Sequence, residues 1–172
     1  MNTPSWQSLL TLDDRELLVQ CEVDTFRGTG PGGQKRNKTE SAVRLRHVPS
    51  GVVARSDESR SQHKNKQHAL SQLRRAIALE LRGEIDLESY APPPDLIDLL
   101  AGRFGRRNAR YPSAMAALLD LLLATAGRLS DAAKAAGSST SKISRAATSD
   151  PTLLQKINAD RAAAGLRSLR PR

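Results

Sequence analysis

Residues 27–41, RGTGPGGQKRNKTES, combine flexible backbone with positive charge and are the first place to look for chemistry. Glycines stand at positions 28, 30, 32 and 33, and no acid follows until Glu40. The cations of the segment are Arg27, Lys35, Arg36 and Lys38. Such a loop either binds the phosphate of a bound cofactor or itself inserts into a polyanionic partner.

The cofactor alternative rests on Gly28–Gly33, which matches the G-x-G-x-x-G pattern of dinucleotide sites. The strand predicted before it alternates with acids, whereas a parallel central strand is continuously apolar. The segment after Gly33 is too short and polar for a crossover helix before the next strand at Val43. No acid ends a second strand, and no Gly-Lys-Ser/Thr follows, so the context disfavours a nucleotide cofactor.

A plain solvated turn is the other alternative, and it accounts for the glycines and the charge. It does not account for Gln34, which lies between the Gly-Gly pair and Lys35-Arg36. It also leaves unexplained a second group of bases in the next polar segment, Arg60, Lys64 and Lys66.

Period-two patterns around the loop predict the elements that position it. Strands are expected over 21–27, 43–48 and 52–56, the last two joined by a turn at Pro49-Ser-Gly51. A polar connector over 57–66 precedes a long amphipathic helix that runs to Arg82, with Gly83 as its C-cap. With a short helix capped by Thr11 or Asp13, these elements predict a small α+β domain.

Beyond this domain the pattern becomes helical. We expect a domain over 1–83, a Pro-rich and basic linker over 84–112, and a helical C-terminal region over 113–172. Helices are predicted at 113–126, 130–136 and 140–147, with a last one from Asp150-Pro151 to about Gly165. The 130–147 pattern resembles a helix-turn-helix that would contact nucleic acid through Lys134, Lys142 and Arg145, although a packed helical bundle is the favoured interpretation.

Composition bounds the class of protein. The 172 residues carry a net charge of +9 and a pI of about 10.4, which favours a nucleic acid or a membrane surface as partner. Residues 27–82 carry thirteen bases against four acids, so the anion site is expected there. Cys21 is the single cysteine, and neither a signal peptide nor a membrane span is predicted; we expect a cytoplasmic protein with no metal site and no cofactor.

Several spaced motifs resemble the class I peptide chain release factors. They are Gly30-Pro-Gly-Gly-Gln34, Asn37-Lys-Thr-Glu-Ser-Ala-Val43, Pro49-Ser-Gly-Val-Val53 and Ser59-Arg-Ser-Gln-His-Lys-Asn-Lys66, followed by the 69–82 helix. The resemblance covers roughly residues 19–82 and implies the Gly-Gly-Gln-type domain that hydrolyses peptidyl-tRNA. One departure lies at Lys35-Arg36, where most of the family has His or Asn and then Val.

The resemblance implies roles for individual residues. Gly32, Gly33 and Gln34 would be catalytic, with the Gln34 backbone N–H stabilising the developing oxyanion or the leaving group. Arg27, Lys35, Arg36 and Lys38, and with them Arg60, His63, Lys64 and Lys66, would contact ribosomal RNA at the peptidyl-transferase centre. His47 and His68 receive no catalytic role.

The implied partners are the ribosome, its P-site peptidyl-tRNA and a glutamine methyltransferase acting on Gln34, and we expect a monomer. Because no codon-recognition domain is apparent in these residues, we expect peptide release without stop-codon reading, as in rescue of stalled ribosomes. The strongly basic tail of known small rescue hydrolases is not seen. Alternatives are a non-catalytic ribosome- or RNA-binding relative, and a DNA-binding regulator that uses the 130–147 helices.

Overall fold

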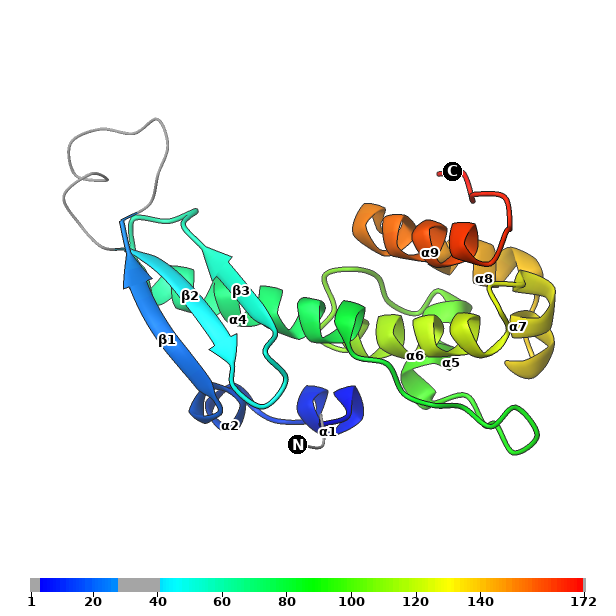
Figure 1. Cartoon of the computed structure of the whole chain (residues 1–172), viewed down its shortest axis with the longest axis horizontal. Helices are drawn as coiled ribbons and strands as arrows, with labels where there is room; N and C mark the ends of the chain where they lie inside the picture. The colour runs from blue at the N-terminus through cyan, green and yellow to red at the C-terminus, as the bar shows by residue number, and fades with distance from the viewer. Residues whose placement is uncertain (1–3, 28–40, 172) are drawn as a thin grey trace. The chain divides into compact units, whose positions relative to one another are not determined.

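The structure is a computed structural model that describes residues 4–27 and 41–171. The chain divides into two compact units, residues 1–80 and residues 81–172. The first unit holds a three-stranded sheet with helices, and the described part of the second is built from helices alone (Figure 1). The predicted α+β fold with a C-terminal helical region is therefore confirmed.

Two short helices open the first unit. Helix α1, Trp6–Leu10, is capped by Ser5, and helix α2, Asp14–Val19, follows three residues later. Asp13 accepts a hydrogen bond from the Glu16 N–H at 2.8 Å, and the Glu16 carboxylate accepts from the Asp13 N–H at 2.8 Å. This reciprocal capping box satisfies two N–H groups that no helix turn can reach, and it settles Asp13 as the cap.

The sheet is antiparallel with strand order β1-β2-β3. Its strands are β1, Cys21–Phe26; β2, Ala42–His47; and β3, Val53–Ser56. The acids that alternate along β1 have partners directly opposite on β2, since Arg44 reaches Asp24 at 2.6 Å and Arg46 reaches Glu22 at 3.1 Å. The polar face of the sheet thus helps to set the strand register.

Helix α4, Gln62–Glu80, packs against β2 and β3 and closes the core of the first unit. Leu73 and Ile77 are fully buried on its inner face, as is Leu45 on the sheet. The helix begins within the predicted polar connector because Ser61 accepts from two backbone N–H groups of its first turn. It ends at Glu80, so Gly83 is not its C-cap, contrary to the prediction.

Five helices form the described part of the second unit. They are α5, Pro94–Ala101; α6, Tyr111–Ala124; α7, Leu129–Ala135; α8, Thr140–Ala147; and α9, Pro151–Ala163. The segment predicted as a linker, 84–112, contains all of α5 and the start of α6. Pro94 is the first residue of α5, where its missing N–H and fixed φ suit a helix start rather than a spacer.

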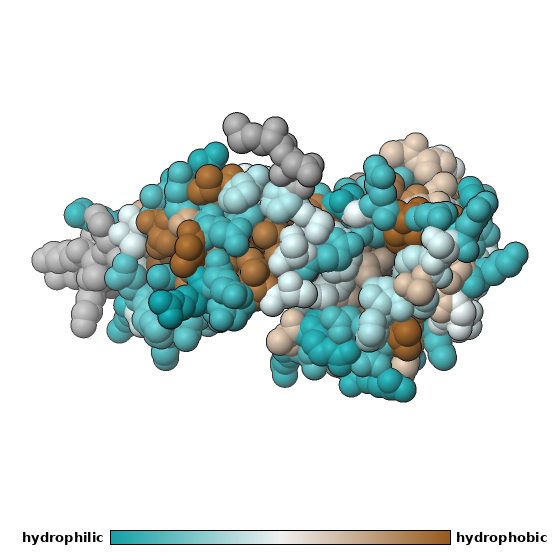
Figure 2. All heavy atoms as spheres, turned by 90° about the horizontal axis from the view of Figure 1, so that it is seen from below, coloured by the Kyte–Doolittle hydropathy of each residue, from teal (hydrophilic) through white to brown (hydrophobic). Residues whose placement is uncertain are grey.

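Helix α6 lies at the centre of this unit and is buried over most of its circumference. No single helix among the described residues is long and apolar enough to cross a bilayer; α6 and α7 reach that length and hydropathy only together, bent by 114°. Apolar side chains lie scattered among hydrophilic ones on the surface in Figure 2. The large apolar side chains that remain exposed are Val19, Val23, Val48, Val53, Leu87, Ile97 and Leu123.

Candidate functional site

One end of the sheet holds both ends of the glycine-rich segment. Phe26, the last residue of β1, stands opposite Ala42, the first residue of β2. The chain therefore leaves the sheet and returns to it at neighbouring positions, and residues 27–41 are closed at their base. The predicted site residues Gly32, Gly33, Gln34, Lys35, Arg36 and Lys38 lie outside the described residues.

A buried asparagine fixes this base. Asn65 is 0% exposed, and its amide nitrogen donates to the carbonyl oxygens of Ser41 at 2.6 Å and Ser59 at 2.8 Å. Its amide oxygen accepts from the Ser59 N–H at 2.8 Å and lies 3.4 Å from the Ser56 hydroxyl. Both donors and both acceptor positions of one side chain are used. We call this set, Asn65 with Ser41, Ser56 and Ser59, the Asn65 clamp.

The Asn65 clamp joins the end of β3 and the connector before α4 to Ser41, which lies 24 positions before Asn65 in the sequence. Ser41 precedes β2, Ser56 ends β3, and Ser59 lies in the connector to α4. Buried hydrogen bonds of this kind are directional, so the clamp sets where the chain emerges from the glycine-rich segment. The described residues therefore fix the two points at which segment 27–41 joins the sheet.

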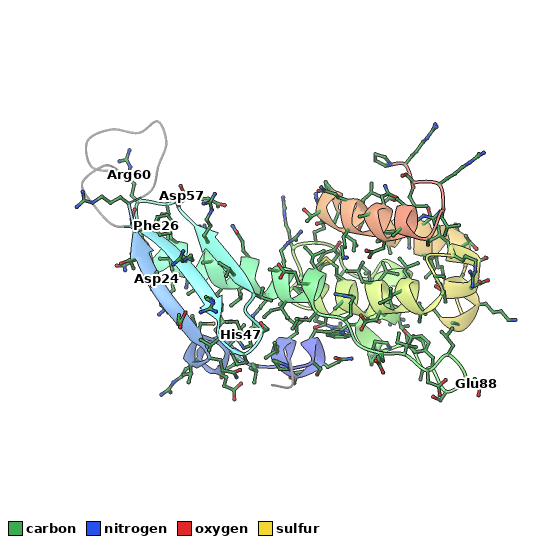
Figure 3. All side chains as sticks on the ribbon, in the orientation of Figure 1. Asp24, Phe26, His47, Asp57, Arg60 and Glu88 are labelled. Carbon is green, nitrogen blue, oxygen red and sulfur yellow. The ribbon has the colours of Figure 1, made fainter. Side chains whose placement is uncertain are left out.

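The predicted RNA-binding residues outside the loop gather at the same end. Arg27 follows β1 directly, Arg60 lies in the connector, and His63, Lys64 and Lys66 are in the first turns of α4. Arg27, Arg60, His63 and Lys64 are exposed, and Lys66 is half-buried. Figure 3 shows Phe26, Asp57 and Arg60 at this end of the sheet and His47 at the opposite end.

Three cations of the connector and of the first turns of α4 are available to a ligand. Within the described part of the chain, the side chains of Arg60, Lys64 and Lys66 form no ion pair and no hydrogen bond. Cations that stay solvated and unpaired at one end of a fold suit contacts to a phosphate backbone. The structure thus brings together every predicted cation that it describes in the first unit.

The histidines do not form an acid–base site. His47 is buried, with Nε2 lying 3.1 Å from Gln20 Oε1 and Nδ1 lying 2.7 Å from the Ser50 hydroxyl. Burial lowers the pKa of His47, which keeps the ring neutral at the end of the sheet away from the loop. His68 Nδ1 lies 3.5 Å from Glu58 on the open surface of α4.

No metal site is found in the described ranges, 4–27 and 41–171, where no three His, Cys, Asp or Glu side chains converge. Cys21 is half-buried, its thiol donates to the Leu17 carbonyl at 3.2 Å, and burial raises its pKa. A neutral thiol in that position suits packing rather than nucleophilic attack.

Asn65 is the functional residue that the sequence patterns missed. The available signal was a polar residue in phase with Ala69, Leu73 and Ile77, at steps of four along the buried face of α4. An asparagine on such a face needs partners, and this requirement predicts a buried hydrogen-bond site.

The family comparison matches the part of the chain that builds this site. Residues 13–90 match the RF-1 domain, and this range includes the sheet, helix α4 and the glycine-rich segment. These residues therefore form an RF-1 domain, and the predicted resemblance to the class I release factors is confirmed over them.

Two similar proteins each align with somewhat less than half of this chain. Peptide chain release factor 1 of Paracidovorax citrulli (strain AAC00-1) is 45% identical over 84 residues, which is 49% of this chain and 22% of that protein. Peptide chain release factor 2 of Neorickettsia sennetsu (strain ATCC VR-367 / Miyayama) is 46% identical over 74 residues, 42% of this chain and 19% of that protein. This chain thus covers about a fifth of the length of these relatives, and its helices α5–α9 lie beyond the RF-1 match.

Proposed function

We propose that this chain hydrolyses the ester bond of peptidyl-tRNA on the ribosome and so releases the nascent peptide. The observation that carries the proposal is the RF-1 match over 13–90, which spans Gly32-Gly33-Gln34. At the level of the family, this match supports a role in translation termination and contact with the ribosome. A non-catalytic relative is not favoured.

Hydrolysis of this ester depends on correct positioning of the reacting groups more than on a strong base. Water attacks the ester carbonyl carbon, and the tetrahedral intermediate collapses to a free peptide acid and the ribose hydroxyl of the tRNA. The Gln34 backbone N–H donates a hydrogen bond to the oxygen on which negative charge develops. Gly32 and Gly33 add no side chains there, so the backbone approaches the ester closely. The Gln34 side chain shapes the pocket for water.

The described residues position the catalytic segment and contact the RNA around it. Phe26 and Ala42 hold the two ends of the catalytic segment together, and the Asn65 clamp fixes its return. Catalysis by positioning needs such a base, because a displacement of about 1 Å costs roughly a hundredfold in rate. Arg27, Arg60, Lys64 and Lys66, with His63, contact RNA phosphates around the catalytic segment.

Release by this chain does not require a stop codon under the proposal. The RF-1 match over 13–90 includes Gly32-Gly33-Gln34, so we assign the release activity to these residues and expect it to be separable from codon reading. The natural substrate is then a stalled ribosome that holds peptidyl-tRNA. A glutamine methyltransferase acting on Gln34 belongs to the same proposal.

The test uses ribosomes that hold labelled peptidyl-tRNA in the P site. The purified chain is added to complexes with a stop codon, with a sense codon, or with messenger RNA that ends in the P site. We expect release without the stop codon at a rate comparable to that with it. Release confined to the stop-codon complex would contradict codon independence, and binding without release in any complex would support the non-catalytic alternative.

The RNA-contact residues have their own test. Arg60→Gln combined with Lys64→Gln should raise the concentration of chain needed for half-maximal release and leave the rate at saturation nearly unchanged, because phosphate contacts position the protein. The control Arg167→Gln with Arg170→Gln removes equal charge from the C-terminal segment of the second unit. An equal effect of the two double variants would show that net charge, not this end of the sheet, governs binding.

A further inference from the structure

Helices α7 and α8 form a helix-turn-helix in the second unit. They are seven and eight residues long, and four residues, Ala136–Ser139, join them. Gly137 turns the chain with φ +57°, a conformation that glycine adopts without strain. Ser139 caps α8 by accepting from the Lys142 N–H, so the second helix starts at a defined residue.

The two helices bury one side and expose the other. Ala132 and Ala133 of α7, and Ile143, Ala146 and Ala147 of α8, are buried, and the two helices are in contact. Small residues at these positions let the helices approach closely. Thr140, Ser141, Lys142 and Arg145 are exposed on α8. The exposed side therefore carries hydroxyls and cations and no large apolar residue.

Arg145 fixes α8 in place. Its guanidinium donates to the Leu100 carbonyl at the end of α5 at 2.9 Å, and it lies 3.4 Å from the position that a side chain at Gly102 would occupy. The sequence pattern grouped Arg145 with the nucleic-acid contacts, whereas the structure gives it an internal partner. We assign it a positioning role.

The basic loop between α5 and α6, residues 102–110, is linked at both of its ends by hydrogen bonds to α8 and to the residue just after it. Before the loop, Arg145 donates to the Leu100 carbonyl, and after it the Tyr111 hydroxyl lies 3.3 Å from the hydroxyl of Ser149, just beyond α8. Arg103 and Arg110 in this loop are paired with Asp98. The side chains of Arg106 and Arg107 are exposed and, like Lys142, have no hydrogen-bond or ion-pair partner among the described residues.

Positive charge predominates in this part of the second unit. Residues 101–149 carry eight Lys and Arg against two acids, Asp120 and Asp131. Asp120 is buried with Arg82, and Asp131 is paired with Arg128. Lys134 of α7 is close enough to Asp131 to help lower the pKa of that carboxyl. The other three cations that lack a hydrogen-bond or ion-pair partner among the described residues, Arg106, Arg107 and Lys142, are called the α8 basic surface.

We infer that the α8 basic surface binds the phosphate backbone of a double-helical nucleic acid, with α8 as the helix that enters the groove. A helix-turn-helix offers its second helix to a groove and lets neighbouring cations contact the backbone. Unpaired cations favour such binding because each phosphate contact releases condensed counterions. The partner is a DNA duplex, because the major groove of B-form DNA admits an α-helix, whereas the major groove of an A-form RNA duplex is deep and narrow.

The test measures binding of the full chain to an RNA duplex and to a DNA duplex of equal sequence, each about two helical turns long. Fluorescence anisotropy is followed between roughly 50 and 200 mM salt. In the triple variant Arg106→Gln, Arg107→Gln, Lys142→Gln we expect the salt slope to fall by about 0.9 for each phosphate that the variant no longer neutralises. We expect this decrease on the DNA duplex, and an equal or larger decrease on the RNA duplex would contradict the insertion of α8 into a groove.

Two control variants keep the inference falsifiable. Arg15→Gln, Arg167→Gln, Arg170→Gln removes the same charge from exposed positions elsewhere and should keep the wild-type slope. Arg106→Lys, Arg107→Lys, Lys142→Arg keeps the charge and should keep the affinity. Equal slopes for the two triple glutamine variants would overturn the inference, and so would a charge-keeping variant that binds as weakly as the glutamine one.

Discussion

A single buried amide, Asn65, organises the end of the sheet at which the glycine-rich segment begins and ends. Its four hydrogen-bonding positions meet the backbone of Ser41 and Ser59 and the hydroxyl of Ser56. No other asparagine among the described residues is fully buried. A charged residue could not replace it, because both donors and acceptors are required.

Replacing Asn65 with Leu should lower the free energy of unfolding of the first unit by about 2–3 kcal/mol, because buried carbonyl and N–H groups lose their partners. Urea unfolding followed by the fluorescence of Trp6, the chain's single tryptophan and 6% exposed, measures this loss. The control Gln67→Leu changes an exposed residue two positions further along α4. A loss no larger than that of the control would contradict the role assigned to the Asn65 clamp.

His47 makes the first unit sensitive to acid. Burial holds the pKa of its imidazole below the ordinary value, so the folded chain takes up this proton at lower pH than the unfolded chain. The stabilisation is fully present above the unfolded pKa of about 6.5 and is lost as pH falls through the lower, folded pKa. Protonation would also place a second N–H against the Ser50 N–H, 3.3 Å away.

The urea midpoint of the wild-type chain should therefore fall between about pH 7 and pH 5. His47→Gln should be less stable at pH 7 but should show a weaker dependence on pH over this range. His63→Gln removes an exposed imidazole and serves as the control. An unchanged pH dependence in His47→Gln would show that another group is responsible.

At the scale of elements, helix α6 depends on one buried ion pair. Asp120 is 3% exposed and accepts from Arg82 Nη1 at 2.9 Å, and the same nitrogen donates to the Ala116 carbonyl at 3.2 Å. Burial lowers the pKa of Arg82, although the Asp120 and Asp160 carboxylates act against this shift. Burial, together with the Asp120 carboxylate, raises the pKa of Tyr90 to about 12. Both shifts have burial as their main cause, and both groups interact with the Asp120 carboxylate.

Asp120→Ala should cost about 3–5 kcal/mol of stability in the second unit, because it leaves the Arg82 guanidinium buried without its carboxylate. The double variant Arg82→Met, Asp120→Leu should recover most of that loss, since it removes both charges. Thermal unfolding followed by circular dichroism checks both expectations. Asp131→Ala breaks the exposed pair with Arg128 and should cost far less stability than Asp120→Ala, because water screens an exposed ion pair. A double variant as unstable as Asp120→Ala would contradict this account.

Elements with a clear period were predictable from the sequence. The three strands and α8, Thr140–Ala147, lie within two residues of their predicted bounds. The start of α4 was missed because residues 57–66 are polar throughout, and its helical turn depends on Ser61 and on the tertiary contacts of Asn65. Helix α5 was missed because a run of prolines suggests a spacer, whereas Pro94 starts a helix that buries Leu96, Leu99 and Leu100.

The candidate site could be predicted from the sequence only where sequence motifs mark its residues. The order of spaced motifs pointed to residues 27–66, and the RF-1 match covers them. The Asn65 clamp was not predictable because Ser41 and Ser59 are distant in sequence from each other and meet only in the folded sheet. Arg145 was assigned to nucleic acid because its internal partner, the Leu100 carbonyl, is a backbone atom that no side-chain pattern reveals.

At the scale of the whole chain, an RF-1 domain is combined with a helical unit that lies beyond the family match. Under the proposals above, the first unit hydrolyses an ester on the ribosome and the second binds a nucleic-acid duplex. The net charge of +9 suits both tasks, since each partner is a polyanion. Under these proposals the two activities are assigned to different residues, so we expect that each can be removed separately.

The most direct measurement of the central claim is the single-turnover rate of peptide release by Gln34→Ala and by Gly33→Ala on ribosomes without a stop codon. Loss of an oxyanion donor typically costs about a hundredfold to a thousandfold in rate, and we expect a loss of that order for Gly33→Ala, where a side chain would misplace the Gln34 N–H. Gln34→Ala keeps the N–H and should lose less with water but should gain reactivity toward larger nucleophiles such as hydroxylamine. Gln155→Ala, an exposed residue of α9, is the matched control. Wild-type release by both site variants would contradict the assignment of the reaction to Gly32-Gly33-Gln34.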